Sequence, residues 1–164
     1  MSIAIYPGSF DPVTLGHLNI IKRASACFDK VIVCTMVNSK KSGMFTPEER
    51  LDMLRRTTKR FPNVEVDCSN ELLANYAARK GATVLVKGLR AVSDFESEVQ
   101  MAMINSKLNP HLETMFLPSS PKYNYLSSTI VKEMARYGCN LADFIPREII
   151  DEVNQRMNEL QGKE

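Results

Sequence analysis

The start of the chain decides the fold, because residues 3–6 (IAIY) run directly into residues 7–17 (PGSFDPVTLGH). The first segment has the apolar, β-branched composition of a buried strand. The second contains Gly8 and Gly16, whose lack of a side chain lets a backbone approach a ligand closely. One face of a helix follows, marked by Leu18, Ile21, Ala24 and Phe28. Because a helix start presents unpaired N–H groups, we expect an anion-binding site in the loop between this strand and this helix.

The same alternation of strand and helix continues to the end of the chain. Further strands are predicted at residues 31–36, 64–66, 83–86 and 114–117. Five further helices are predicted from their start and stop signals. One begins at Thr46, Pro47 and Glu49 and carries Phe61, and the next is capped by Asn70 and ends at Gly81. The others cover residues 94–108, the segment from Ser127 to Gly138, and about residues 146–160. Strands separated by helices imply parallel crossovers. We therefore expect an α/β fold, a doubly wound five-stranded parallel sheet with helices on both faces, in a single domain over residues 1–164.

Composition excludes several classes of protein. The 164 residues include 21 Lys and Arg against 19 Asp and Glu, so the net charge is only +2, and no basic stripe for nucleic acid is visible. The apolar runs are far shorter than the ~20 residues of a membrane span, and the first residues lack the pattern of a signal peptide. The four cysteines are widely spaced, which favours free thiols in a reducing cytoplasm. With two histidines, a protein-held metal site is not expected.

Ligands of parallel sheets bind beyond the carboxyl ends of the strands, so the loops at residues 7–16, 37–45, 87–93 and 118–127 are expected to form the site. His17 lies in the first helical turn, where the helix dipole disfavours its protonated form. A neutral imidazole there can donate a hydrogen bond to a phosphate oxygen. Basic loop residues are usually solvated surface, but in a parallel sheet Lys41, Lys87 and Arg90 are expected to converge on one crevice, and such a group suits a polyphosphate.

The last of these loops leads into Ser127, Ser128 and Thr129, three hydroxyl residues at a predicted helix start. They are good helix caps, and they also provide a second set of N–H and O–H donors for an anion. No serine or cysteine has an evident histidine partner, and no pair of carboxylates is placed for acid–base catalysis. The dinucleotide and P-loop fingerprints are missing as well. Donors around a phosphate, without a protein nucleophile, favour phosphoryl or nucleotidyl transfer.

Several motifs together resemble a known family. Residues 8–12 (GSFDP), 14–17 (TLGH) and 126–129 (LSST) are similar to the signatures of the nucleotidyltransferase superfamily with a T/H-x-G-H motif. Within it, residues 87–96 (KGLRAVSDFE) and the chain length resemble the bacterial phosphopantetheine adenylyltransferases, over nearly the whole chain. The resemblance implies a Rossmann-like fold, a homohexamer, and transfer of the adenylyl group of ATP to 4'-phosphopantetheine. The products would be 3'-dephospho-coenzyme A and pyrophosphate, in the penultimate step of coenzyme A synthesis.

The resemblance also implies roles for individual residues. His17 would stabilise the transition state at the α-phosphorus. From the cluster of donors we hypothesise that Lys41 and Arg90 are catalytic as well, because they can neutralise the charge that develops there. The residues implied to bind ATP are Ser9, Phe10, His17, Gly88, Leu89, Arg90, Glu98, Tyr123, Asn124, Tyr125, Leu126, Ser127, Ser128 and Thr129. Those implied to bind the acceptor are Ser9, Lys41, Leu73 and Lys87. Mg²⁺ would accompany ATP, held mostly by phosphates and water rather than by a protein cage.

Three of these positions carry a qualification. Ser9 stands where Thr is frequent in the family, and the hydroxyl is kept. Lys87 stands where Arg is usual, which keeps the charge and loses the bidentate fork, so acceptor affinity could differ. Lys41 is preferred to its neighbour Lys40 because of its spacing to Asn38 and Phe45, and Lys40 is the alternative.

Other functions stay open on the sequence alone. A superfamily enzyme acting on nicotinamide mononucleotide or a polyol phosphate would share His17 and the Ser127 helix start, but has no reason to keep residues 87–96. A non-catalytic nucleotide-binding module is the alternative from another class, because a fold does not determine function. An RNA-binding role has less support, since no RNA-binding domain is appended. The helix at residues 94–108 is apolar on more than one face, which fits a subunit contact.

Overall fold

The computed structural model describes residues 1–90 and 92–162, and its centre is a five-stranded parallel sheet with the order β3-β2-β1-β4-β5. The strands are β1 (Ile3–Gly8), β2 (Lys30–Met36), β3 (Val64–Ser69), β4 (Val84–Leu89) and β5 (Glu113–Pro118). The chain winds outward from β1 to β3 and then returns to the other side of β1. The winding therefore reverses between β1 and β4, which is where a doubly wound sheet opens a ligand crevice at its carboxyl edge. The predicted fold class is confirmed.

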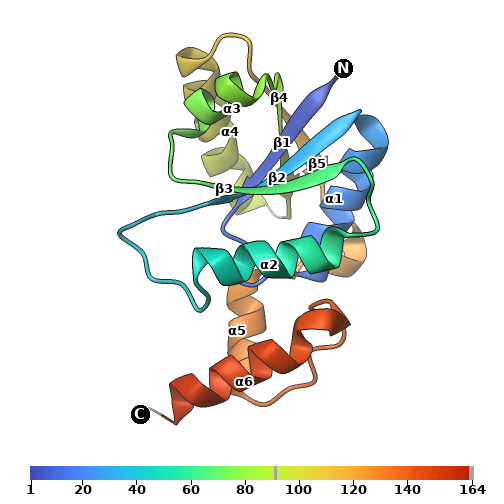
Figure 1. The fold of residues 1–164 in the computed structure, drawn as a ribbon, viewed down its shortest axis with the longest axis vertical. Coiled ribbons are helices and arrows are strands. Elements are labelled where there is room, and N and C mark those ends of the chain that lie inside the picture. Colours follow the sequence, from blue (N-terminus) through green and yellow to red (C-terminus); the bar gives the residue numbers. More distant parts are fainter. Residues whose placement is uncertain (91, 163–164) are drawn as a thin grey trace.

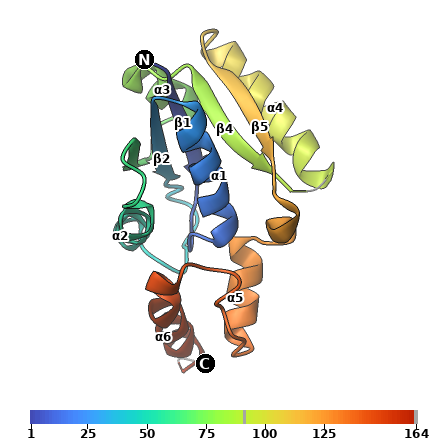
Figure 2. The same ribbon diagram turned by 90° about the vertical axis from the view of Figure 1, so that its right-hand side faces the viewer.

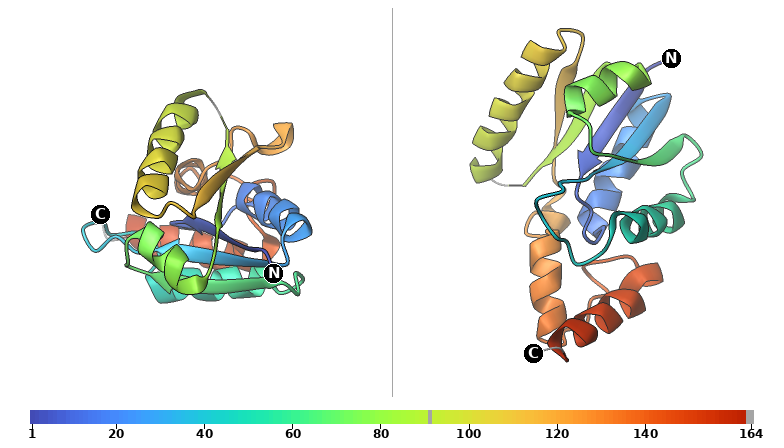
Figure 3. Two further views of the ribbon diagram at one scale, coloured as in Figure 1. Left: turned by 90° about the horizontal axis from the view of Figure 1, so that it is seen from above. Right: turned by 60° about the vertical axis from the view of Figure 1, so that its left-hand side comes forward.

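Helices cover both faces of this sheet, as predicted (Figures 1 and 3). They are α1 (Leu15–Cys27), α2 (Pro47–Thr58), α3 (Leu73–Lys80), α4 (Val92–Leu108), α5 (Ser128–Arg136) and α6 (Ile150–Gln161). One core lies under α1 and α2, where Ile21 and Leu54 are fully buried against the sheet. The other lies under α3, where Tyr76 and Ala77 pack on Ile5 and Leu85.

The last two helices lie beyond the carboxyl edge of the sheet, below α1 and α2 in Figure 2. Ser127 is the N-cap of α5 and accepts a hydrogen bond from the Ile130 N–H at 3.2 Å, as the sequence predicted for this helix start. The predicted C-terminal helix begins as a 3-10 turn at Arg147–Ile149 and becomes α-helical only from Ile150. These helices close one side of the crevice.

The helix signals read from the sequence are mostly confirmed. Thr46 and Glu49 form a reciprocal capping box at the start of α2, and Gly81 ends α3 with a φ of 68°. Asn70 is not the cap of α3, and that prediction is wrong. Leu72 holds the N-cap position, because the Ser69 hydroxyl accepts the Glu71 N–H at 3.1 Å and forms the turn instead.

Two further boundaries differ from those expected. Phe61 was expected on α2, but the helix ends at Thr58, and the following Pro62 disfavours helical backbone at Phe61. The helix expected from residue 94 begins two residues earlier, at Val92. Ala91, part of the motif at residues 87–96, and residues 163–164 of the expected domain lie outside the described residues. Within the described ranges, every helix is too short or too polar to cross a membrane.

Candidate active site

His17 occupies the third position of α1 and forms a capping box with Thr14 at the N-cap. Its Nδ1 atom accepts a hydrogen bond from the backbone N–H of Thr14 at 3.0 Å, while the backbone N–H of His17 donates to the Thr14 hydroxyl at 3.2 Å. A ring nitrogen that accepts from a backbone N–H carries no proton in the neutral ring. The proton of the neutral imidazole therefore resides on Nε2.

The surroundings of His17 keep its ring neutral. Burial lowers the pKa of His17 most, and the nearby charges of Arg90 and Lys87 lower it further, to about 4. The ring of Phe10 packs edge-on against the imidazole, with centroids 5.0 Å apart. Neutrality was expected from the helix dipole, and the structure adds two further causes, burial of the ring and a pair of neighbouring cations.

A cavity of about 320 Å³, called the first cavity here, opens beside His17 between the loops that follow β1, β4 and β5. Twelve of the residues predicted for the site line it: Ser9, Phe10, His17, Lys87, Gly88, Arg90, Glu98, Tyr123, Leu126, Ser127, Ser128 and Thr129. Leu89, Asn124 and Tyr125, although predicted to bind ATP, are not among its lining residues, and Tyr125 is 57% exposed. The expected convergence is confirmed for the loops after β1, β4 and β5. The loop after β2, at residues 37–45, was expected in the same crevice but lines a neighbouring cavity.

Gly8 was expected to let the backbone approach a ligand closely, but in the structure the ring of Phe10 occupies the space beside it. A Cβ atom built on Gly8 would lie 3.0 Å from Cζ of Phe10, so the close approach there is that of the Phe10 ring. Phe10 itself has a φ of 48°, a backbone conformation that is uncommon for any residue except glycine. The loop thus turns sharply at Phe10 and lays its ring between Gly8 and His17.

The two cations of the first cavity are each held by a carboxylate of α4. Lys87 Nζ lies 3.4 Å from Glu98, and Arg90 Nε lies 3.1 Å from Asp94. Arg90 also donates to the carbonyl oxygen of Leu126 at 3.3 Å. Such partly exposed pairs contribute little to stability, so phosphate oxygens can replace the carboxylates at small cost.

The start of α5 forms the opposite wall. The Ser127 hydroxyl caps the helix, and the Ser128 hydroxyl donates to the carbonyl oxygen of Pro12 at 2.8 Å, which ties α5 to the loop after β1. Two of the three predicted hydroxyls are thus engaged within the protein, whereas Thr129 is exposed. For an anion, this helix start offers its unpaired N–H groups.

The residues predicted to bind the acceptor are spread over three adjoining cavities. Lys41 lines a second cavity, of about 790 Å³, together with Ser9, and Lys40 is not among its lining residues. Leu73 and Lys87 line a third, smaller cavity of about 110 Å³ on the α3 and α4 side of the sheet. Ser9 and Lys87 each line two cavities, so they mark where a ligand would pass from one cavity to the next.

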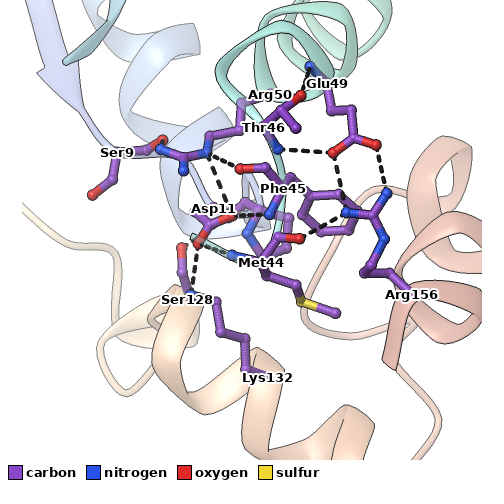
Figure 4. A network of polar contacts seen from close by, with 11 residues as sticks. Ser9, Asp11, Met44, Phe45, Thr46, Glu49, Arg50, Ser128, Lys132 and Arg156 are labelled. Carbon is purple, nitrogen blue, oxygen red and sulfur yellow. Dashed lines mark hydrogen bonds and ion pairs between the residues drawn. The ribbon is translucent and has the colours of Figure 1, made fainter. Parts of the chain in front are cut away.

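Sequence reasoning missed the polar network around Asp11 (Figure 4), whose members are among the residues that line the second cavity. The Asp11 carboxylate accepts hydrogen bonds from the backbone N–H groups of Met44 and Phe45, both at 2.9 Å, and from Lys132 Nζ at 2.8 Å. Arg50 Nε lies 3.4 Å away. Burial raises the pKa of Asp11, but these hydrogen bonds outweigh it and hold the pKa below its ordinary value. The only signal in the sequence was the place of Asp11 within the GSFDP motif.

Metal ligands do not gather in this site. Over residues 1–90 and 92–162, no three His, Cys, Asp or Glu side chains are grouped so that they could hold an ion. The carboxylates nearest the first cavity, Asp94 and Glu98, are paired with Arg90 and Lys87. The donor set around the cavity is cationic and suits phosphate oxygens.

Both a protein-family model and individual known proteins match the sequence of this chain. A family model described as cytidylyltransferase-like matches residues 5–134. A phosphopantetheine adenylyltransferase of Caldanaerobacter subterraneus subsp. tengcongensis is 51% identical over 156 residues, covering 95% of this chain and 98% of that protein. One from Clostridium botulinum (strain Hall) is 49% identical over 158 residues, covering 96% of each chain. The chain belongs to the phosphopantetheine adenylyltransferase family.

Solved structures that resemble this chain share its fold at low sequence identity. A Vibrio parahaemolyticus protein, described as a candidate nicotinate-nucleotide adenylyltransferase, has a TM-score of 0.70 at 18% identity, covering 96% of this chain and 95% of its own. Nicotinic acid mononucleotide adenylyltransferase of Plasmodium falciparum has a TM-score of 0.62 at 15% identity, covering 97% and 95%. The mononucleotide enzymes thus resemble this chain in fold alone, whereas the phosphopantetheine adenylyltransferase relatives match it along nearly its whole sequence.

Proposed function

We propose that the protein transfers the adenylyl group of ATP to the phosphate of 4'-phosphopantetheine, and so forms 3'-dephospho-coenzyme A and pyrophosphate. The observation that carries the proposal is a neutral His17, with its proton on Nε2, in a cavity that Lys87, Arg90 and the start of α5 also line. Membership of the phosphopantetheine adenylyltransferase family supplies the acceptor. This reaction is the penultimate step of coenzyme A synthesis.

ATP is placed in the first cavity, because its donors match a polyphosphate. The phosphates would lie between the N–H groups at the start of α5 and the guanidinium of Arg90, which would leave Asp94 for a phosphate oxygen. Phe10, Gly88, Glu98, Tyr123 and Leu126 line the rest of the same cavity. Leu89, Asn124 and Tyr125 would contact ATP from just outside it, at the rim formed by the β4 and β5 loops.

The acceptor is placed where the three cavities adjoin. Its phosphate would lie near Ser9, which separates the first and second cavities, within reach of the cations Lys41 and Lys87. The organic part would extend past Lys87 to Leu73 in the third cavity. Lys87 provides a point charge in this position, without the bidentate geometry of an arginine.

The chemistry needs no protein nucleophile and no general base, because the acceptor phosphate is itself an anionic oxygen nucleophile. One of its oxygens attacks the α-phosphorus in line, and the bond from that phosphorus to the oxygen bridging to the β-phosphorus breaks. The electron pair leaves with pyrophosphate. His17 Nε2–H donates to an α-phosphate oxygen, while Lys41 and Arg90 neutralise the charge that develops, so positioning and charge stabilisation supply the rate.

Mg²⁺ is proposed to enter with ATP, coordinated by phosphate oxygens and water. It reduces the negative charge of the phosphates when bound. The cationic side chains that line the first cavity, Lys87 and Arg90, would neutralise the negative charge of ATP that Mg²⁺ leaves uncompensated. Chelation of Mg²⁺ is expected to abolish turnover and leave the free energy of unfolding of the protein unchanged, because the ion belongs to the substrate.

We also propose a homohexamer and a cytoplasmic location. Helix α4 exposes Met101, Met103, Ile104 and Leu108, with exposed fractions of 50%, 69%, 45% and 51%. A helix with this much exposed apolar surface is suited to a subunit contact. Light scattering after size exclusion should give about six times the 18.5 kDa chain mass. All four cysteines are free, which suits a reducing compartment.

The proposal is tested by pyrophosphate release with ATP, Mg²⁺ and a panel of acceptors: 4'-phosphopantetheine, nicotinamide mononucleotide and glycerol 3-phosphate, with CTP as a second donor. Turnover with ATP and 4'-phosphopantetheine alone is expected. Turnover only with another acceptor would overturn the acceptor assignment while keeping His17. ATP binding without turnover on any acceptor would instead favour a nucleotide-binding module.

A further inference from the structure

The loop that carries Lys41 is anchored at its far end by two residues from distant parts of the chain. The loop spans residues 37–45, and its middle consists of exposed residues held mainly by local turns, such as the Lys41 N–H to the Asn38 carbonyl at 3.1 Å. At its end, Met44 and Phe45 are bound on opposite sides by Asp11 and Arg156 (Figure 4). We call this pair of contacts the clasp.

Asp11 binds the N–H side of the clasp. Its two carboxylate oxygens accept the N–H groups of Met44 and Phe45, and its side chain is only 7% exposed. Lys132 of α5 and Arg50 of α2 flank the same carboxylate. Asp11 therefore joins the β1 loop, the β2 loop, α2 and α5, and all of these segments line the second cavity together with Ser9.

Arg156 of α6 binds the other side. Its Nη1 donates to the Met44 carbonyl at 2.8 Å, and its guanidinium lies 5.0 Å from the ring centroid of Phe45. Glu49 of α2 pairs with the same guanidinium and also accepts the Thr46 N–H at 2.8 Å, so the cap of α2 and the clasp share one carboxylate. A residue near the C-terminus thus contacts the loop of an acceptor-binding lysine.

We infer that Asp11 and Arg156 are positioning residues, which hold the 37–45 loop so that Lys41 reaches the acceptor phosphate. The inference rests on the proposed acceptor-binding role of Lys41. A displacement of about 1 Å of a group that stabilises the transition state can cost about a hundredfold in rate. Release of either side of the clasp should therefore weaken catalysis through Lys41, although neither residue touches the reacting atoms.

The chain provides a matched control. Arg56, like Arg156, links α2 to α6: it pairs with Asp52 and Glu152 and donates to the Glu148 carbonyl at 3.1 Å. All of these partners lie outside residues 37–45. Arg56→Gln removes a helix–helix ion pair of the same kind as Arg156→Gln, without touching the clasp.

The experiment compares Asp11→Asn, Arg156→Gln, Arg56→Gln and Lys41→Ala by steady-state kinetics and by amide hydrogen exchange in the full chain. Asp11→Asn and Arg156→Gln are expected to lower kcat/KM for 4'-phosphopantetheine by about ten- to a hundredfold, with the KM for ATP within about twofold. Faster exchange at the Met44 and Phe45 amides should accompany the loss. Arg56→Gln should lower the Tm without either effect.

A double variant decides whether the effect passes through Lys41. If the clasp acts by positioning Lys41, adding Arg156→Gln to Lys41→Ala should cause no further loss of kcat/KM. Full additivity, or normal kinetics in both clasp variants beside a defective Lys41→Ala, would overturn the inference and leave the role of Lys41 intact. Normal kinetics in Lys41→Ala would show that its proposed role is wrong, and the inference would fail with it.

Discussion

The Nδ1 atom of His17 accepts the backbone N–H of Thr14 at 3.0 Å, and this single contact serves both the helix and the site. It satisfies one of the N–H groups left open at the start of α1. It also selects the tautomer whose proton lies on Nε2, the side of the ring that remains for a ligand. The geometry of helix capping therefore determines which ring nitrogen of His17 carries the proton beside the first cavity.

His17→Ala removes that donor, and kcat is expected to fall by about a hundredfold to a thousandfold. His17→Gln should recover part of the loss, because its amide can approach the position of Nε2 and glutamine is favoured at this capping position. Steady-state kinetics with ATP and 4'-phosphopantetheine measure both variants. Near-normal turnover of His17→Ala would contradict the assignment.

The low pKa of His17 makes folding stability depend on pH. Its pKa is about 4 in the folded chain, below the ordinary 6.5. As the pH falls between these values the unfolded chain gains a proton and the folded chain does not, so the free energy of unfolding decreases. Urea unfolding at pH 7 and pH 5 should show a smaller decrease in His17→Gln than in the wild type. An equal decrease in the two proteins would refute a His17 that stays neutral in the folded chain at pH 5.

Lys87 is predicted to bind the acceptor through its positive charge rather than through a specific hydrogen-bond geometry. Lys87→Ala should raise the KM for 4'-phosphopantetheine by about tenfold or more, the usual effect of losing a hydrogen bond to a charged group. Lys87→Arg should restore it. Because the charge of Lys87 lowers the pKa of His17, Lys87→Ala should also raise that pKa, which NMR titration can follow without substrate. An unchanged His17 titration would mean that the two side chains are not neighbours.

Gly43 is predicted to be required for the contact between the 37–45 loop and the buried ion pair. A Cβ atom there would lie 2.1 Å from Nη2 of Arg50 and 2.8 Å from Oδ2 of Asp11. Gly43→Ala should therefore displace these side chains and lower kcat/KM for the acceptor. Kinetics at varied acceptor concentration test this, and wild-type values would show that the loop adapts without loss.

Gly81→Ala provides the contrasting case. Gly81 ends α3 with a φ of 68°, and a Cβ atom would meet nothing within 4 Å, so the cost arises from backbone conformation alone. The free energy of unfolding should fall by about 1–2 kcal/mol, measured by urea denaturation. kcat/KM should not change, because the residue is remote from the three cavities. A loss of activity equal to that of Gly43→Ala would show that both effects reflect global stability.

The sequence predicts most of the fold and the first cavity because both follow local rules. Strand–helix alternation determines a parallel sheet, and parallel strands place their following loops at one edge, so His17, Lys87 and Ser127 meet there. Helix limits at Thr46, Gly81 and Gly138 depend on single residues whose capping chemistry is strong. The prediction that Asn70 caps α3 is wrong because the hydroxyl of the neighbouring Ser69 forms the turn before the helix.

The network around Asp11 could not be predicted in the same way. Its partners come from positions 44, 45, 50 and 132, and no period or motif spacing relates an aspartate to an arginine on α2 and a lysine on α5. The contact of Arg156 with Met44 depends on how α6 packs across the carboxyl edge of the sheet. Such contacts are set by tertiary packing between elements, and they determine how Lys41 is held.

The central claim, a single transfer of the adenylyl group at the His17 site, is tested most directly by the stereochemical course at the α-phosphorus. An ATP analogue in which one α-phosphate oxygen is replaced by sulfur, with known configuration, would be converted with 4'-phosphopantetheine, and the configuration of the product would be determined. A single in-line attack by the acceptor phosphate predicts inversion. Retention would require two displacements and an adenylylated protein residue, and would contradict the account.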